Sequence, residues 1–147
     1  MSLVKYNEWI IDIHDEKTKQ LYSNITPNIS KDYHDYLAIC DDLRDDEKEF
    51  FDKLCINPRL CDKLHSITIG QKKSFGGSYY VFGDFISYPK QSCITAEELY
   101  KRNFEYNFTD TRIHVGRFIF DIQCPHHSIK TIPKDLPNGC VCILFSL

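Results

Sequence analysis

The sequence predicts an α+β domain in which a mixed or mainly antiparallel sheet of about five strands is packed by three or four helices. Two observations carry this prediction. Several segments alternate apolar and polar residues with the period of a strand, and others repeat apolar residues at helical spacing. The order of these segments lacks the strict alternation of a doubly wound fold. The chain has 147 residues, 42% of them hydrophobic, and no linker or repeat, so residues 1–147 are expected to form a single domain.

The first strand is expected at residues 8–14. Trp9, Ile11 and Ile13 alternate there with more polar residues, as a half-buried strand requires. After a loop, Ser30 can cap a helix, because its hydroxyl can accept from a free N–H of the first turn. The inner stripe of this helix comprises Tyr33, Tyr36, Leu37, Cys40 and Leu43.

A second helix is expected from about Asp46. Acidic residues at this point lie at the positive end of the helix dipole, and Phe50, Phe51 and Leu54 follow at inward-facing positions. Asn57 and the proline after it end the helix. Residues 59–64 are then compatible with one short helical turn.

The pattern changes to that of strands after this point. Residues 65–70 and 78–88 are expected to pair antiparallel around a hairpin loop at residues 71–77. Gly76 and Gly77 would provide the positive φ angles that a hairpin turn needs. The sequence therefore predicts one hairpin in the middle of the chain.

One more helix and two more strands complete the prediction. Thr95 and Glu98 form a capping box, which predicts a helix at residues 96–104. Residues 111–123 are expected to form one long strand with apolar side chains on both faces, and residues 141–145 have a similar pattern. The prolines between these two strands indicate an irregular loop.

Cysteine usage and the chain's beginning predict the compartment. The seven cysteines are odd in number and mostly embedded in apolar stretches, as is typical of reduced thiols. The first residues show no charged region followed by a long apolar one, so no cleaved secretion signal is expected. Apolar runs are far shorter than the roughly 20 residues of a membrane-spanning helix. We therefore expect a cytoplasmic protein with no membrane partner, and no motif indicates a cofactor.

Acidic residues are concentrated in one part of the chain. Residues 32–62 contain ten acids against four basic residues, a net charge of −6, whereas the whole chain has a net charge of −3. A concentrated negative surface attracts a cationic partner and accelerates the encounter. The competing interpretation is that these acids form the solvated faces and first turns of two surface helices. The candidate partner-binding residues are Asp41, Asp42, Asp45, Asp46 and Glu49.

A second cluster contains possible metal ligands. Cys124, His126 and His127, followed by Cys140 and Cys142, include enough soft ligands for tetrahedral zinc. Neither half has the usual C-x2-C spacing, and in a strand Cys140 and Cys142 would lie roughly 6 to 7 Å apart. We therefore predict no metal site, but buried thiols beside a surface histidine pair.

Two other function classes remain open. A small hydrolase or nuclease would use histidine or cysteine, for example His14 and His114, although no motif identifies a catalytic residue. A nucleic-acid-binding module would gather basic residues beside exposed rings, and residues 116–120 are similar to the aromatic strand of an RNA-recognition module without its complete signature. The net negative charge makes direct nucleic-acid binding the less favoured alternative. Its basic residues would be Lys72, Lys73, Lys101, Arg102, Arg112 and Arg117.

Three segments stand out in the chain, an acid-rich run at residues 41–49 and two aromatic segments at residues 79–82 and 118–120. In this combination of acidic and aromatic segments the chain resembles the immunity proteins of bacterial toxin systems, including contact-dependent inhibition. The resemblance transfers no named site, because such proteins span many folds. It implies a protein that binds a cognate toxin, such as a basic nuclease domain, and occludes its active site without turnover. Tyr33 and Tyr36 would be aromatic anchors for that partner if they are exposed.

Overall fold

The computed structural model describes residues 2–26, 30–89, 111–123 and 139–147. Its described part is an antiparallel sheet of seven strands with three helices, so the α+β class is confirmed and the expected strand number of about five is too low. The predicted helix at residues 96–104 and the loop before the last strand fall outside the described residues. The elements, in chain order, are β1 (Ser2–Tyr6), β2 (Trp9–Ile13), α1 (Asp15–Asn24), α2 (Lys31–Cys40), α3 (Asp45–Lys53), β3 (Asp62–Ile69), β4 (Lys72–Ser87), β5 (Ile113–Val115), β6 (Phe118–Ile122) and β7 (Cys140–Ser146).

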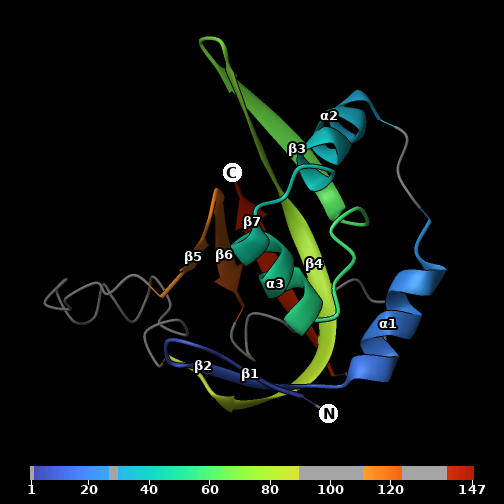
Figure 1. Cartoon of the computed structure of the whole chain (residues 1–147), viewed down its shortest axis with the longest axis vertical. Helices are drawn as coiled ribbons and strands as arrows, with labels where there is room; N and C mark the ends of the chain where they lie inside the picture. The colour runs from blue at the N-terminus through green and yellow to red at the C-terminus, as the bar shows by residue number, and fades with distance from the viewer. Residues whose placement is uncertain (1, 27–29, 90–110, 124–138) are drawn as a thin grey trace, which may run out of the picture.

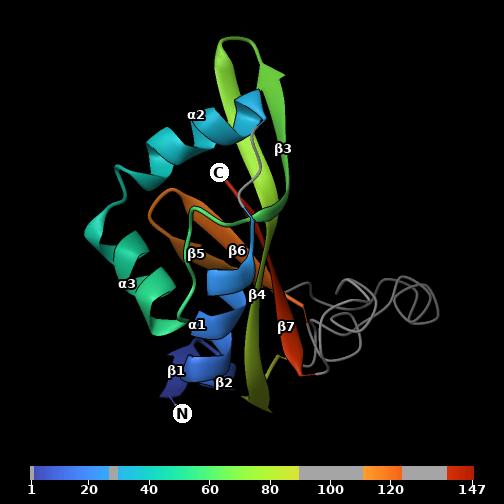
Figure 2. The ribbon, with the colours of Figure 1, turned by 90° about the vertical axis from the view of Figure 1, so that its right-hand side faces the viewer.

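The sheet is built around the 16-residue strand β4 (Figure 1). One edge of β4 pairs with β7, which continues to β6 and then β5. The other edge pairs with β3 along the first half of β4 and with β2 along the second half, and β2 continues to β1. Figure 2 shows α2 and α3 on one face of this sheet.

Each of three hairpins turns through two residues, the first of which has positive φ. These residues are Asn7 (φ 53°), Gly70 (φ 64°) and Gly116 (φ 55°), where asparagine and glycine tolerate the left-handed backbone. The predicted hairpin loop at residues 71–77 is therefore wrong, because β4 begins at Lys72. The predicted long strand at residues 111–123 is also wrong, since Gly116 divides it into the hairpin β5–β6.

Gly76 and Gly77 lie within β4 and serve close packing. A Cβ atom on Gly76 would lie 2.7 Å from Nε2 of His65, and one on Gly77 would lie 2.9 Å from the ring of Phe145. A side chain at either position would therefore force these neighbours to move. These glycines mark places where other residues approach the strand backbone, and not a turn.

The start of the chain and the segment after α3 differ further from the sequence prediction. The strand expected at residues 8–14 is confirmed as β2, but it pairs with β1, for which no element was predicted. The helix α1 was not predicted either. The short helical turn considered at residues 59–64 is wrong, because β3 begins at Asp62.

The inward faces of the two predicted helices are confirmed. Ser30 caps α2 by accepting from Tyr33 N–H at 3.2 Å, and Tyr36 is fully buried. On α3, Phe50 stacks on Phe120 of β6 with ring centroids 3.9 Å apart, and Phe51 is also buried. Tyr33 and Tyr36 belong to the interior, and the idea that they anchor a partner is therefore wrong.

Two side-chain hydroxyls of α1 form hydrogen bonds to the part of β4 that has no described strand beside it on this edge. Between the stretches paired with β3 and β2, the N–H and C=O groups of Tyr80 and Phe82 on β4 face α1. Tyr22 Oη donates to Tyr80 O at 2.9 Å and accepts from Tyr80 N–H at 3.2 Å. Thr18 Oγ1 accepts from Phe82 N–H at 3.0 Å. Since Thr18 and Tyr22 are four residues apart, one face of α1 takes the place of a strand here.

Helix α3 ends in a Schellman motif with an unusual residue. Cys55 N–H donates to Asp52 O at 3.1 Å, and Ile56 N–H donates to Phe51 O at 2.9 Å. Cys55 has φ 57°, a conformation that glycine normally provides.

We expect Cys55→Gly to have a free energy of unfolding about 1 kcal/mol higher than that of Cys55→Ala, because only glycine relieves the left-handed strain. Both variants lose the thiol, so their difference isolates the backbone. Urea denaturation of the two variants measures it, and equal stabilities would contradict this account.

Candidate functional site

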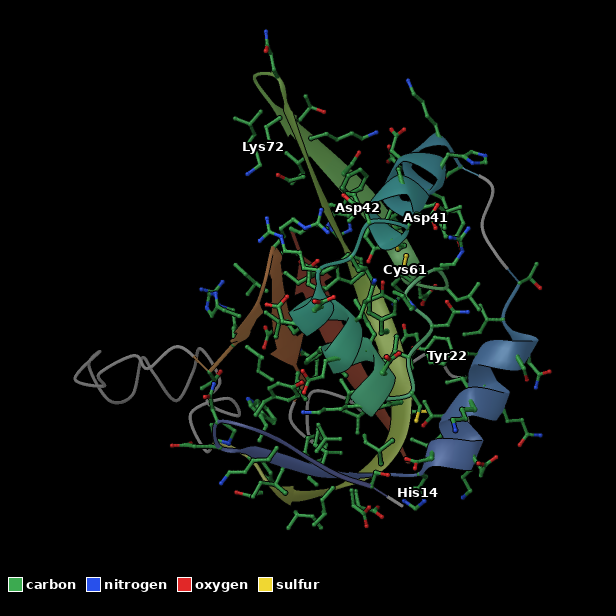
Figure 3. The ribbon with its side chains drawn as sticks, in the orientation of Figure 1. His14, Tyr22, Asp41, Asp42, Cys61 and Lys72 are labelled. Carbon is green, nitrogen blue, oxygen red and sulfur yellow. The ribbon has the colours of Figure 1, made fainter. Side chains whose placement is uncertain are left out.

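The acidic candidate residues lie at the corner between α2 and α3. Asp41 and Asp42 are in the connecting turn, Asp45 and Asp46 begin α3, and Glu49 lies one turn further along. All five side chains are exposed. Figure 3 shows Asp41 and Asp42 at the end of α2, above the start of α3. We call these five residues the acidic corner.

Two members of the acidic corner are paired with basic residues of the same chain. Asp41 forms an ion pair with Arg59, and Glu49 Oε1 lies 2.7 Å from Lys53 Nζ. No lysine or arginine of the described segments lies within ion-pair distance of Asp42, Asp45 or Asp46. The carboxylates available to a cationic partner are therefore concentrated on these three residues.

Other acids in residues 32–62 connect the helices to the sheet. Lys73 of β4 lies 2.7 Å from both Asp32 Oδ1 and Asp35 Oδ2 of α2. Hydrogen bonds from Lys73 and then Ser66 lower the pKa of Asp32 below its ordinary value. These contacts fasten α2 to the β3–β4 hairpin. The net charge of this stretch therefore overstates the negative field that it presents to solvent.

The corner is held in place by an ion pair between the buried Glu47 and the half-buried Arg117, which the sequence does not predict. Glu47 has no exposed surface, and its Oε1 accepts from Arg117 Nη2 at 2.9 Å and from Arg44 N–H at 2.8 Å. Its Oε2 accepts from Arg117 N–H at 2.8 Å. Arg117 Nη2 also donates to Asp42 O at 3.0 Å, so the β5–β6 turn is tied directly to the acidic corner.

The protonation state of Glu47 follows from these contacts. Burial opposes its charge, but hydrogen bonds from Arg117 and from the backbone of Arg44 outweigh burial and lower the pKa of Glu47. Glu47 is therefore charged at neutral pH. The signal that would have identified it is its position three residues after the helix N-cap, where glutamate commonly reaches back to the backbone.

The possible zinc ligands are only partly described. Cys124, His126 and His127 lie outside the described residues, whereas Cys140 and Cys142 are buried in β7. Burial raises the pKa of Cys140 to about 11, which disfavours the thiolate that zinc requires. No group of three possible ligands converges within the ranges that the structure describes. The five described cysteines form no disulfide.

The residues of the other two function classes are separated or already engaged. His14 follows β2 and lies 2.9 Å from Asp84, whereas His114 lies on β5 at the other end of the sheet order. Of the basic residues considered for nucleic-acid binding, Lys73 and Arg117 are in ion pairs, and Lys101 and Arg102 are outside the described residues. Lys72 and Arg112 are exposed, but Lys72 begins β4 at the tip of its hairpin with β3, whereas Arg112 directly precedes β5. Phe118 and Phe120 are buried, so these rings cannot stack on bases.

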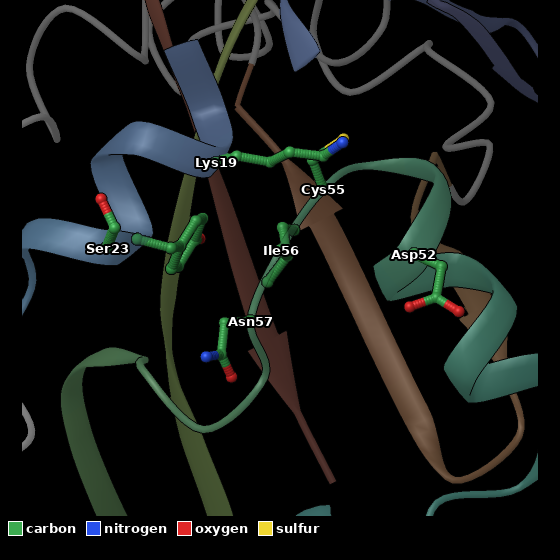
Figure 4. A pocket seen from close by; sticks show the side chains of 7 residues that line it. Lys19, Ser23, Asp52, Cys55, Ile56 and Asn57 are labelled. Atoms are coloured by element: carbon green, nitrogen blue, oxygen red, sulfur yellow. The ribbon is translucent and has the colours of Figure 1, made fainter. Parts of the chain in front are cut away.

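A hollow of about 370 Å³ lies between α1 and the segment that follows α3 (Figure 4). Tyr22 and Ile56 line it together with polar side chains that include Lys19 and Asn57. Ser23 in its wall donates to Gln20 O at 2.7 Å, and Asn57 Oδ1 accepts from Arg59 N–H at 3.1 Å. Burial raises the pKa of Cys55, another lining residue, which makes its thiol a poor nucleophile.

Comparisons with protein-family models, curated proteins and solved structures found no match. Among the helices that the structure describes, none is long and apolar enough to cross a bilayer.

Proposed function

We propose that this protein binds a cationic protein through the acidic corner and neutralises it by covering its active site, as an immunity protein does to a toxin nuclease. The observation that carries the proposal is the group of exposed carboxylates on Asp42, Asp45 and Asp46 with no basic partner in the described part of the chain. Such carboxylates can replace the phosphates that a basic nuclease surface binds.

The contacts beneath the corner support this role. The Arg117 guanidinium donates a hydrogen bond to the Asp42 carbonyl. The Glu47 carboxylate accepts hydrogen bonds from that guanidinium and from the backbone N–H of Arg44. A surface that is already ordered loses little conformational entropy when a partner binds. The carboxylates are therefore presented by a fixed backbone, which favours tight binding with few contacts.

The test compares two double variants that remove the same number of charges. Asp42→Asn with Asp45→Asn changes one turn residue and one residue in the first turn of α3. Glu8→Gln with Glu16→Gln changes one residue of the β1–β2 turn and one in the first turn of α1, so it is a matched control. We expect the first variant to lose about tenfold or more in affinity at low salt, because interfacial charge pairs contribute about 1.5 kcal/mol or more.

Isothermal titration against the basic toxin domain encoded nearest to the gene for this protein measures the affinity at two salt concentrations. The wild type should bind more weakly as salt increases, and the corner variant should show a smaller salt dependence. If the wild type fails to bind, or if both variants lose the same affinity, the proposal is wrong.

A further inference from the structure

The outer edge of β3 is unpaired in the part of the chain that the structure describes. β3 pairs with β4 on one side only, and the hairpin that they form projects beyond the rest of the sheet (Figures 1 and 2). Near its tip, Ile67 is 59% exposed and Ile69 is 76% exposed. Proteins commonly protect such an edge with proline, inward-pointing charge or a covering element. Residues 65–69 contain no proline and no acidic or lysine side chain, and no described strand pairs with their outer edge. Helix α2 lies against the face of β3 that carries Ser66, and the register irregularity of β3 precedes this stretch, between Asp62 and His65.

The register identifies the backbone groups available on this edge. The two-residue turn closes with the pair Ile69 and Lys72, which is hydrogen-bonded in such a hairpin. Because antiparallel pairs alternate, the N–H and C=O groups of Ile67 also face β4, whereas those of Ser66 and Thr68 face outward. Tyr80 lies an even number of residues after Lys72 on β4, and its groups face this same edge, in agreement with the alternation.

We propose that a second copy of this chain pairs with this edge, in an antiparallel β3–β3 contact whose two-fold axis passes through Ile67. The residues around Ile67 are chemically symmetric, because Ser66 precedes it and Thr68 follows it. In this register Ser66 lies opposite Thr68 of the second copy, and each such pair exchanges two main-chain hydrogen bonds.

The side chains are complementary in the same register. Ile67 meets Ile67 of the second copy in a non-hydrogen-bonded pair, where side chains approach most closely. Ile69 meets His65, so the exposed aliphatic side chains of both copies form one patch on that face. On the other face Ser66, whose hydroxyl donates to Asp32 of α2 at 3.0 Å, lies opposite Thr68 of the second copy. No like charges are placed opposite each other from residue 65 to residue 69, which makes a second copy a suitable occupant.

The test uses complementary charges at the proposed axis. We expect sedimentation equilibrium to give a concentration-dependent dimer for the wild type, whereas Ile67→Lys and Ile67→Glu alone are monomers because each places like charges opposite each other. An equimolar mixture of these two variants should form a heterodimer. Ile86→Lys is the matched control, because Ile86 on β4 is 61% exposed but lies away from β3.

Thr68→Pro tests the backbone directly, since proline removes an outward N–H and leaves the bonds to β4 intact. Thr68→Val keeps that N–H and should still dimerise. Circular dichroism melting establishes that each variant is folded before it is analysed. A monomeric wild type, a dimer that survives Ile67→Lys, or a failure of the two charged variants to recombine would overturn the proposal.

Discussion

Glu47→Ala is expected to lower the free energy of unfolding by about 3 kcal/mol, the lower end of the usual cost of removing one partner from a buried ion pair, because the Arg117 side chain is 30% exposed. The substitution leaves the Arg117 guanidinium without its carboxylate. It also removes the acceptor of two backbone N–H groups, those of Arg117 and Arg44. It also leaves a cavity, since Glu47 has no exposed surface. Urea denaturation followed by circular dichroism measures the loss.

A second variant separates the ion pair from simple packing. Replacing Glu47 and Arg117 together by Met removes both charges and keeps most of the volume, so this double variant should be more stable than Glu47→Ala alone. If Glu47→Ala costs less than about 1 kcal/mol, or if the double variant is the less stable of the two, the ion pair does not hold the corner as described.

Because the pKa of Glu47 is lowered in the folded protein, its contribution to the free energy of unfolding depends on pH. A carboxyl group whose pKa is lower in the folded state contributes stability above its unfolded pKa, and this contribution is lost as pH falls through the folded pKa. Part of the acid destabilisation of the wild type, below about pH 4.3, therefore comes from Glu47. Glu47→Gln does not titrate, so its stability should change less over this acidic range.

The sequence predicted well those features that depend on neighbours along the chain. Ser30 as an N-cap and the inward positions of Phe50 and Phe51 follow from local hydrogen bonding and helical periodicity, and the structure confirms them. Gly76 and Gly77 were misinterpreted because glycine has two uses, positive φ and the absence of a side chain. Only the positions of His65 and Phe145 in the fold show that the second use applies.

The same distinction applies to the acidic corner. Helical periodicity indicates which acids are exposed, but it cannot show which of them meet a base from a distant strand. Asp32 and Asp35 are engaged by Lys73, and Glu47 by Arg117, which lies 70 residues away in the chain. Gly116 completes this last contact, because a Cβ atom there would lie 2.5 Å from Glu47 Oε2. Such contacts are set by topology, which the residue pattern alone does not determine.

Helix α1 leads to the second large expected effect. Tyr22→Phe and Thr18→Val each preserve side-chain shape but remove the hydroxyl that satisfies β4, so each should lower the free energy of unfolding by about 1–3 kcal/mol. The cost arises because the N–H and C=O of Tyr80 and the N–H of Phe82 stay buried without a partner. Ser23→Ala is the control, since Ser23 is an exposed hydroxyl of α1 that bonds only within its own helix.

Amide hydrogen exchange locates this effect at a single group. In Tyr22→Phe the Tyr80 amide loses its acceptor, so its exchange should accelerate by more than the loss of global stability explains. Thr18→Val should do the same to Phe82, whereas Ser23→Ala should change neither amide. A Tyr80 amide that stays as protected in Tyr22→Phe as in the wild type would show that α1 only covers the sheet. Faster exchange at Tyr80 alone would show that a tyrosine hydroxyl on a helix can take the hydrogen-bonding place of a missing strand.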